Sequence, residues 1–237
     1  MPSSDRLAAG QVALVGLFVT ALVTAQLTAS KLLVFQIPFG LPFTGSSLVL
    51  PGAALAYALT FFASDCYSEL YGRRAARTLV NVGFAMTLVM LALVYTTIEA
   101  PIAPFSEVGQ DAFSRVLWSS ANIVAGSLLA YVVSQHWDVI AFHAIRERTG
   151  GAYLWLRNVG STASSQAVDT VIFVTVAFAV APSVLGVGPV YGTEQILSLI
   201  VGQYALKLAI AVLDTPFVYA VRRALAGGDA PAVAATD

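Results

Sequence analysis

Charged and redox-active side chains are both scarce in this chain. Only 11% of the 237 residues are Asp, Glu, Lys or Arg, and the formal net charge is −1, which argues against a nucleic-acid partner. One cysteine and two histidines exclude a disulfide framework and a Cys/His metal cluster. The sequence also lacks a G-x-x-x-x-G-K-S/T motif, so it does not predict ATP hydrolysis by this chain. We expect neither a metal nor a cofactor.

Apolar sequence fills the chain instead, since 58% of the residues are hydrophobic, which is unlike an ordinary soluble domain. A hydrocarbon core about 30 Å thick needs roughly 20 apolar residues per helix. Six stretches are long enough or nearly so: 10–33, 47–64, 77–98, 116–144, 160–181 and 194–221. We therefore predict an all-α integral membrane protein, a six-transmembrane-helix bundle. Its parts would be an N-terminal cytoplasmic segment at residues 1–9, a six-helix transmembrane domain at 10–224 and a disordered C-terminal tail at 225–237.

Positive charges lie on one side of the predicted membrane. Arginines follow the second, fourth and sixth stretches, whereas the connections after the third and fifth hold mainly Glu and Asp. Because cytoplasmic loops carry the Lys/Arg excess, both termini are predicted to be cytoplasmic in a multi-pass protein of the inner cell membrane. Residues 36–46 would then be an external loop, either a simple connector or a lid.

The motif Ser-Gln-x-x-Asp occurs twice, at 134–138 and 165–169, in consecutive apolar stretches. A carboxylate at membrane depth is costly and is therefore a functional candidate, as a ligand group or a proton carrier. The two stretches run in opposite directions, so the motifs are expected to face each other. Hydrogen bonding between the helices is the alternative. The side chains predicted to form a shared polar pocket are Gln135, Asp138, Gln166 and Asp169.

Three further polar residues lie within apolar stretches and are candidates for the same pocket. Gln203 and Lys207 are four residues apart and share a face of the last stretch. Lys207 is expected to neutralise Asp138 or Asp169, or to meet a substrate oxygen, with a purely structural salt bridge as the alternative. Asn122 belongs to a stripe of small residues on the fourth stretch whose other members suit helix packing.

A second group of residues has a possible accessory or gating role. The string Ser-Asp-Cys-Tyr-Ser-Glu-Leu-Tyr-Gly at 64–72 predicts a short amphipathic helix at the cytoplasmic surface, either structural or part of a gate. Trp137 could stack on a ligand or face lipid. The gate or accessory candidates are Asp65, Glu69, Arg157, Ser30, Trp137 and Phe173.

Several strings together resemble the queuosine precursor transporter family, also called the vitamin uptake transporters. They are Thr-Ala-Ser-Lys at 28–31, the string 64–72, Trp-Leu-Arg-Asn at 155–158, Ser-Thr at 161–162 and Ser-Gln-x-x-Asp-Thr at 165–170. The similarity extends from Thr28 to Pro216. Cys66 and Val159 depart from the residues expected there, an aliphatic side chain and an asparagine.

The resemblance implies import of 7-cyano-7-deazaguanine and 7-aminomethyl-7-deazaguanine. We expect the base to enter a central cavity between the second, fourth, fifth and sixth stretches. The aspartates would accept hydrogen bonds from the base, the glutamines would pair with either kind of group, and aromatic side chains would cover its flat face. The partners would be the deazapurine and the lipid bilayer, with a homodimer or a separate energising ATPase module left open. A substrate-capture subunit is thus one alternative, and a channel or structural bundle is another. An intramembrane hydrolase is not expected, because the G-x-G-D pattern is absent.

Overall fold

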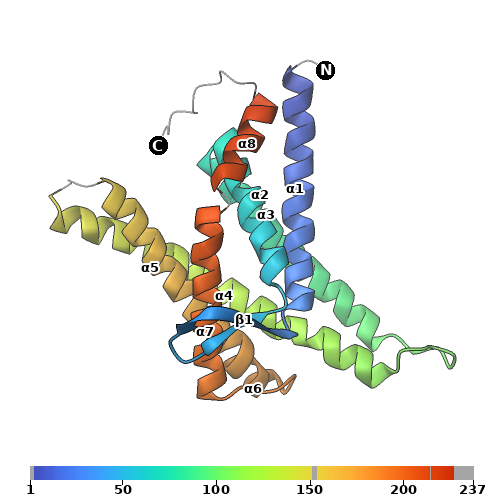
Figure 1. Ribbon diagram of the computed structural model, residues 1–237. Coiled ribbons are helices and arrows are strands. Elements are labelled where there is room, and N and C mark those ends of the chain that lie inside the picture. The colour runs from blue at the N-terminus through green and yellow to red at the C-terminus, as the bar shows by residue number, and fades with distance from the viewer. Residues whose placement is uncertain (1–2, 151–153, 214, 227–237) are drawn as a thin grey trace.

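The computed structural model describes residues 3–150, 154–213 and 215–226, which fold into helices and one antiparallel hairpin (Figure 1). In chain order the elements are α1 (Ser3–Thr28), β1 (Leu32–Leu41), β2 (Gly45–Pro51), α2 (Ala54–Tyr71), α3 (Arg73–Glu99), α4 (Gln110–Arg148), α5 (Leu154–Thr175), a π-helical turn (Val176–Val180), α6 (Ala181–Leu185), α7 (Thr193–Leu213) and α8 (Thr215–Ala226).

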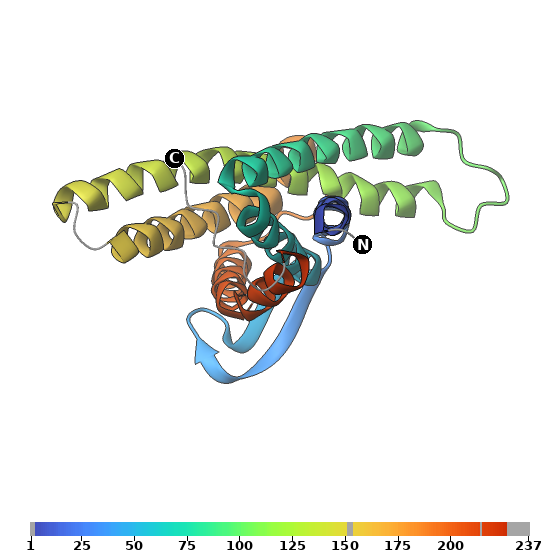
Figure 2. The same cartoon turned by 90° about the horizontal axis from the view of Figure 1, so that it is seen from above.

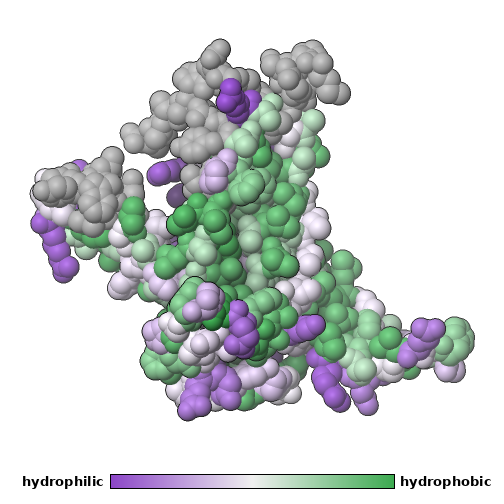
Figure 3. Space-filling model, viewed as in Figure 1, coloured by the Kyte–Doolittle hydropathy of each residue, from purple (hydrophilic) through white to green (hydrophobic). Residues whose placement is uncertain are grey.

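Five segments among the described residues are long and apolar enough to cross a membrane. They are Ala8–Thr28, Arg73–Glu99, Gln110–Arg148, Val159–Leu185 and Thr193–Val218. These correspond to the first, third, fourth, fifth and sixth predicted stretches. In the space-filling view, hydrophobic residues cover the middle of the visible face and hydrophilic residues gather toward its ends (Figure 3). A soluble protein rarely exposes so large an apolar patch. The apolar exterior therefore fits a protein whose surface contacts lipid.

Helix α4 is the longest element and organises the fold. Its 39 residues span about 58 Å at 1.5 Å per residue. Helix α3 packs along its first half and α5 along its second half, so the three form one long layer (Figure 2). Helices α1, α2, α7 and α8 form a second group that crosses this layer near its middle (Figure 1). Helices of both groups therefore come together near the middle of α4.

The hairpin is the main departure from the predicted all-α fold. Residues 36–46 were expected to be a loop and 47 the start of a helix, but β1 and β2 pair from Leu32↔Pro51 to Leu41↔Gly45. Strand β2 packs against α7. Gly202 of α7 is close to the backbone of β2, and a β-carbon there would overlap the carbonyl oxygen of Val49.

The second helix therefore lies further along the chain than expected. Helix α2 begins at Ala54 and continues to Tyr71, so it includes most of the string 64–72 that was predicted to be a separate surface helix. Because its second half carries Asp65 and Glu69, α2 is not among the five segments identified above by length and hydropathy.

One proline directly follows the fifth predicted stretch and another interrupts the sixth. Pro182 has no N–H to donate to the carbonyl of Phe178, and the backbone N–H of Tyr191 donates to that carbonyl instead, at 3.0 Å. The preceding turn is widened to a π-helix before α6 begins. The last stretch divides into α7 and α8, with Pro216 in the first turn of α8, where its missing N–H costs least.

Candidate functional site

A cavity of about 250 Å³ lies where the two groups of helices cross. Its wall comes from α1, α2, α3, α4, α5 and α7. The cavity was expected between the second, fourth, fifth and sixth predicted stretches, and the first and third stretches also contribute to it. Most of the lining is apolar. The polar side chains in the wall are Gln26, Tyr57, Thr60, Ser64, Arg77, Ser127, Tyr131, Ser134, Gln135, Gln166, Asp169, Gln203 and Lys207.

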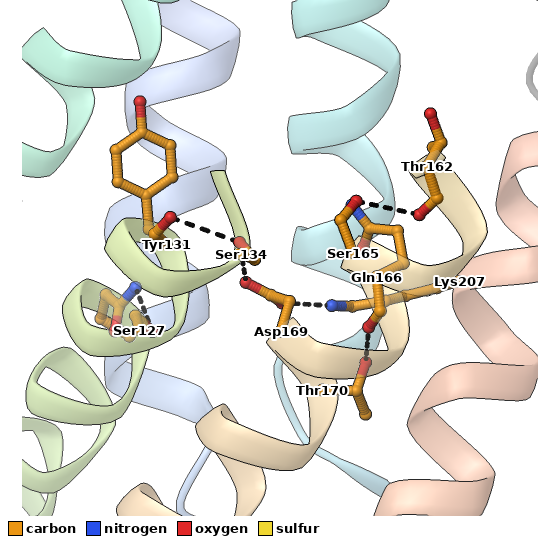
Figure 4. A network of polar contacts seen from close by, with 10 residues as sticks. Ser127, Tyr131, Ser134, Thr162, Ser165, Gln166, Asp169, Thr170 and Lys207 are labelled. Carbon is orange, nitrogen blue, oxygen red and sulfur yellow. Dashed lines mark hydrogen bonds and ion pairs between the residues drawn. The ribbon is translucent and has the colours of Figure 1, made fainter. Parts of the chain in front are cut away.

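An ion pair between α5 and α7 forms the polar centre of this wall. The Nζ atom of Lys207 lies 2.5 Å from Oδ2 of Asp169, and the hydroxyl of Ser134 donates to Oδ1 at 3.3 Å (Figure 4). Lys207 is only 4% exposed, and its Nζ atom also lies 5.5 Å from the centre of the Tyr57 ring. Both oxygens of this carboxylate therefore have partners before any ligand enters.

Two amide oxygens in the wall have no such partner. Oε1 of Gln166 and Oε1 of Gln203 are buried, and neither accepts a hydrogen bond from the described residues. Buried polar atoms are nearly always hydrogen-bonded. Gln166 comes from α5 and Gln203 from α7, and both line the cavity. Both residues thus line the cavity, while their amide oxygens are covered by protein atoms and accept no hydrogen bond from the described residues.

Aromatic rings supply the flat surfaces of the cavity. Phe173 of α5 is buried and lines the wall, as predicted for a side chain that could cover a planar ligand. Tyr57 and Phe61 of α2 meet edge to face with centroids 5.0 Å apart, and both also line the cavity. Apolar and aromatic walls with a few polar groups are typical of small-molecule sites.

Asp138 does not share this cavity, which corrects the expectation that the two motif aspartates meet in one pocket. Helices α4 and α5 are antiparallel, with Ser134 opposite Asp169. Asp138 is therefore one turn further along α4, and it is not among the described residues that line the cavity. Its Oδ1 atom is buried and has no hydrogen-bond partner in the described part of the chain. Gln135 of the same motif does line the wall and is otherwise exposed.

Asn122 has a structural position rather than the expected place in the pocket. Its Nδ2 atom donates to the carbonyl oxygen of Val187 at 2.7 Å. This hydrogen bond ties α4 to the segment between α6 and α7. Asn122 is not among the described lining residues.

The accessory candidates lie mostly outside the wall. Trp137 is 43% exposed, and its indole N–H donates to the hydroxyl of Ser164 at 3.2 Å, linking α4 to α5. The side chain of Arg157 falls outside the described residues. The other candidates that are described and do not line the cavity are Ser30, Asp65 and Glu69.

Several polar lining residues were missed by the sequence analysis, among them Gln26 and Arg77. Gln26 of α1 is 3% exposed and lies 3.4 Å from the hydroxyl of Ser127. A lone glutamine within an apolar stretch is the signal that could have revealed it. Arg77 of α3 was counted only toward the cytoplasmic charge bias, yet it also lines the cavity.

Comparison with known proteins places the chain in a family. Residues 51–221 match the family model described as "Putative vitamin uptake transporter". This chain belongs to that family. It is 36% identical over 168 residues to a protein of Bacillus subtilis (strain 168) named "Probable queuosine precursor transporter", covering 70% of this chain and 69% of the relative. No solved structure matches it.

Membership of the vitamin uptake transporter family makes the chain a multi-pass membrane transporter, in agreement with the resemblance and the apolar helices. The matched range holds α2, α3, α4, α5 and α7, and hence five of the six helices that form the cavity wall. Gln26 of α1 lies before it.

Proposed function

We propose that this transporter imports 7-cyano-7-deazaguanine and 7-aminomethyl-7-deazaguanine across the inner cell membrane for queuosine salvage. The name of the Bacillus subtilis relative supports this substrate class. The single structural observation that carries the proposal is the pair of partnerless amide oxygens, on Gln166 and Gln203, in an otherwise largely apolar cavity.

The cavity suits the donor edge of a deazaguanine. The ring N–H and the exocyclic amino group of the base would donate to Oε1 of Gln166 and Oε1 of Gln203 once these amide groups turn toward the cavity, since neither oxygen accepts a hydrogen bond from the described residues. Lys207 would donate to the carbonyl oxygen of the base, while Asp169 holds the ammonium group in place. A base without the amino group would leave an acceptor unpaired, and unpaired buried groups give strong discrimination.

The size and walls of the cavity point to the same ligand class. Its volume of about 250 Å³ is just below the range of roughly 300–1,000 Å³ usual for drug-sized ligands, as expected for one fused ring system. Phe173 and Tyr57 would cover the faces of the ring, and Gln135 lies on the exposed part of the wall. In this proposal Asp138 and Asn122 support the helices and do not touch the base.

We further propose six crossings, with α2 as the sixth, and a cytoplasmic location for both termini. The start of α1 and the end of α8 lie at the same end of the molecule (Figure 1), which requires an even number of crossings if they share a side of the membrane. Arginines at the start of α3 and the end of α4 supply the cytoplasmic positive charge. The hairpin and the α3–α4 connection would face outward.

Queuosine in tRNA provides the test. A strain unable to make deazaguanine is supplied with low concentrations of 7-cyano-7-deazaguanine and expresses the wild-type chain or one of two variants. We expect queuosine with the wild-type chain and strongly reduced queuosine with Gln203→Met at equal membrane levels. Gln195→Met is the matched control, because Gln195 is an exposed glutamine on the same helix and does not line this cavity. Absence of queuosine with the wild-type chain would contradict the proposal.

A further inference from the structure

The ionisable side chains of the cavity wall do not balance. Among the described lining residues, the acids and bases are Arg77, Asp169 and Lys207. Lys207 and Asp169 neutralise each other at 2.5 Å. Arg77 has no second lining carboxylate to match it, so the wall carries two positive groups and one negative group.

We propose that this charge distribution makes the cavity selective for the neutral cyano base over the cationic aminomethyl base. The inference rests on the proposed function and refines its substrate class. An alkylamine has a pKa of roughly 10 and is protonated at neutral pH, whereas a nitrile is uncharged. A cation that enters a largely apolar cavity loses its hydration and needs a counter-charge in return.

The described residues of the wall provide no free counter-charge for an ammonium group. Oδ2 of Asp169 is held by Lys207, and Oδ1 accepts the hydroxyl of Ser134. To bind a second cation, the carboxylate would have to share its single negative charge with two ammonium groups. The Lys207 ammonium is almost completely buried, so water screens its repulsion only weakly.

One of the aromatic rings in the wall already lies near a cation. An ammonium group can also be held over an aromatic face, but Nζ of Lys207 already lies 5.5 Å from the Tyr57 ring centre. The partnerless amide oxygens of the lining residues Gln166 and Gln203 are neutral, as are the other amide and hydroxyl oxygens of the described wall. They suit the donor edge that both bases share and do not distinguish an ammonium group from a nitrile.

Three probes separate charge from shape in a direct binding measurement. The full-length chain is purified into lipid nanodiscs, and dissociation constants are measured at neutral pH by calorimetry. The probes are the 7-cyano, the 7-aminomethyl and the neutral 7-hydroxymethyl forms of 7-deazaguanine, of which the last two have nearly the same size. We expect the aminomethyl base to bind about tenfold or more weakly than either neutral base, because like charges are brought together.

Arg77 allows the charge to be changed without removing the buried pair. Arg77 is exposed on α3, so Arg77→Glu is tolerated by the fold and converts the wall to one positive and two negative groups. We expect this variant to reduce or reverse the preference for the neutral bases. Arg74→Glu is the matched control, since Arg74 is exposed on the same helix and does not line this cavity; its preference should equal that of the wild type.

Each other outcome overturns the inference. If the wild-type chain bound the aminomethyl base as tightly as the neutral bases, or more tightly, the charge of the ligand would not determine its affinity. Equally weak binding of the hydroxymethyl and aminomethyl bases would show that the shape of the 7-substituent determines the affinity. An unchanged preference for the neutral bases in Arg77→Glu would show that the charge of Arg77 is not the cause of the selectivity. These three results leave the proposed function intact, whereas binding of none of the three bases would contradict both.

Discussion

The ammonium group of Lys207 on α7 lies 2.5 Å from a carboxylate oxygen of Asp169 on α5. The lysine side chain is almost completely buried, and the aspartate side chain is 16% exposed. A pair of this kind fixes the relative position of two membrane helices, because neither charge can be left alone in an apolar environment. The pair is neutral as a unit, so it leaves Arg77 as the unmatched charge among the described lining residues.

Removal of one partner of this pair should destabilise the protein strongly. Lys207→Met leaves a buried carboxylate without its counter-charge, so we expect a loss of about 3–5 kcal/mol and a lower melting temperature in detergent. The double variant Lys207→Met/Asp169→Leu removes both charges and should recover much of that stability without recovering transport. A melting temperature of Lys207→Met equal to that of the wild type would contradict the assigned role.

Loss of a partnerless amide should weaken binding without weakening the fold. In Gln166→Met the free acceptor Oε1 disappears, and no described protein donor loses a partner. We expect about tenfold weaker binding of 7-cyano-7-deazaguanine, the scale of one hydrogen bond, with an unchanged melting temperature. Calorimetry and thermal unfolding of the same preparation measure both. A large drop in melting temperature with unaltered affinity would make this glutamine structural.

The contact between the hairpin and α7 depends on the absence of a side chain at position 202. A β-carbon in Gly202→Ala would overlap the carbonyl oxygen of Val49, so β2 must shift, and we expect a loss of about 1–3 kcal/mol. Gly16→Ala is the control, because a β-carbon at this exposed position in α1 meets no atom within 4 Å. That change should be neutral or stabilise the helix by up to about 1 kcal/mol. Equal melting temperatures for the two variants would contradict the close packing of the hairpin.

The proposed topology can be tested by cysteine labelling. Cys66 is 1% exposed, so the native chain serves as a control with little reaction. We expect a membrane-impermeant maleimide to label Ser106→Cys, in the α3–α4 connection, on intact cells. Thr149→Cys, just after α4, should react only after the membrane is permeabilised. The reverse pattern would place both termini outside the cytoplasm.

The sequence predicts those features that depend on residues close together in the chain. Runs of apolar residues identify five segments that the structure confirms as long enough to span a membrane. The cost of a buried charge also predicts that Lys207 pairs with either Asp138 or Asp169. In the structure its partner is Asp169. The hairpin could not be predicted in the same way, because it packs through a contact between Val49 and Gly202, which are far apart in the sequence.

The position of Asp138 shows why a repeated motif is not enough to define a site. The pairing of Ser134 with Asp169 makes the α4–α5 arrangement nearly symmetric at the level of the two motifs. The surroundings are not symmetric, because α7 packs against α5 and brings Lys207 to only one of the aspartates. Gln26 and Arg77 were missed for a related reason, since only the crossing of α1 and α3 with α4 brings them to the cavity.

Counterflow in proteoliposomes that contain only this chain tests the central claim most directly. The claim is that the cavity between these helices carries a deazaguanine base through the free acceptors on Gln166 and Gln203. Vesicles loaded with unlabelled 7-cyano-7-deazaguanine should accumulate the labelled base with saturable kinetics, and the Gln166→Met/Gln203→Met variant should not. Absence of counterflow with the wild-type chain, or full counterflow with the double variant, would contradict the account.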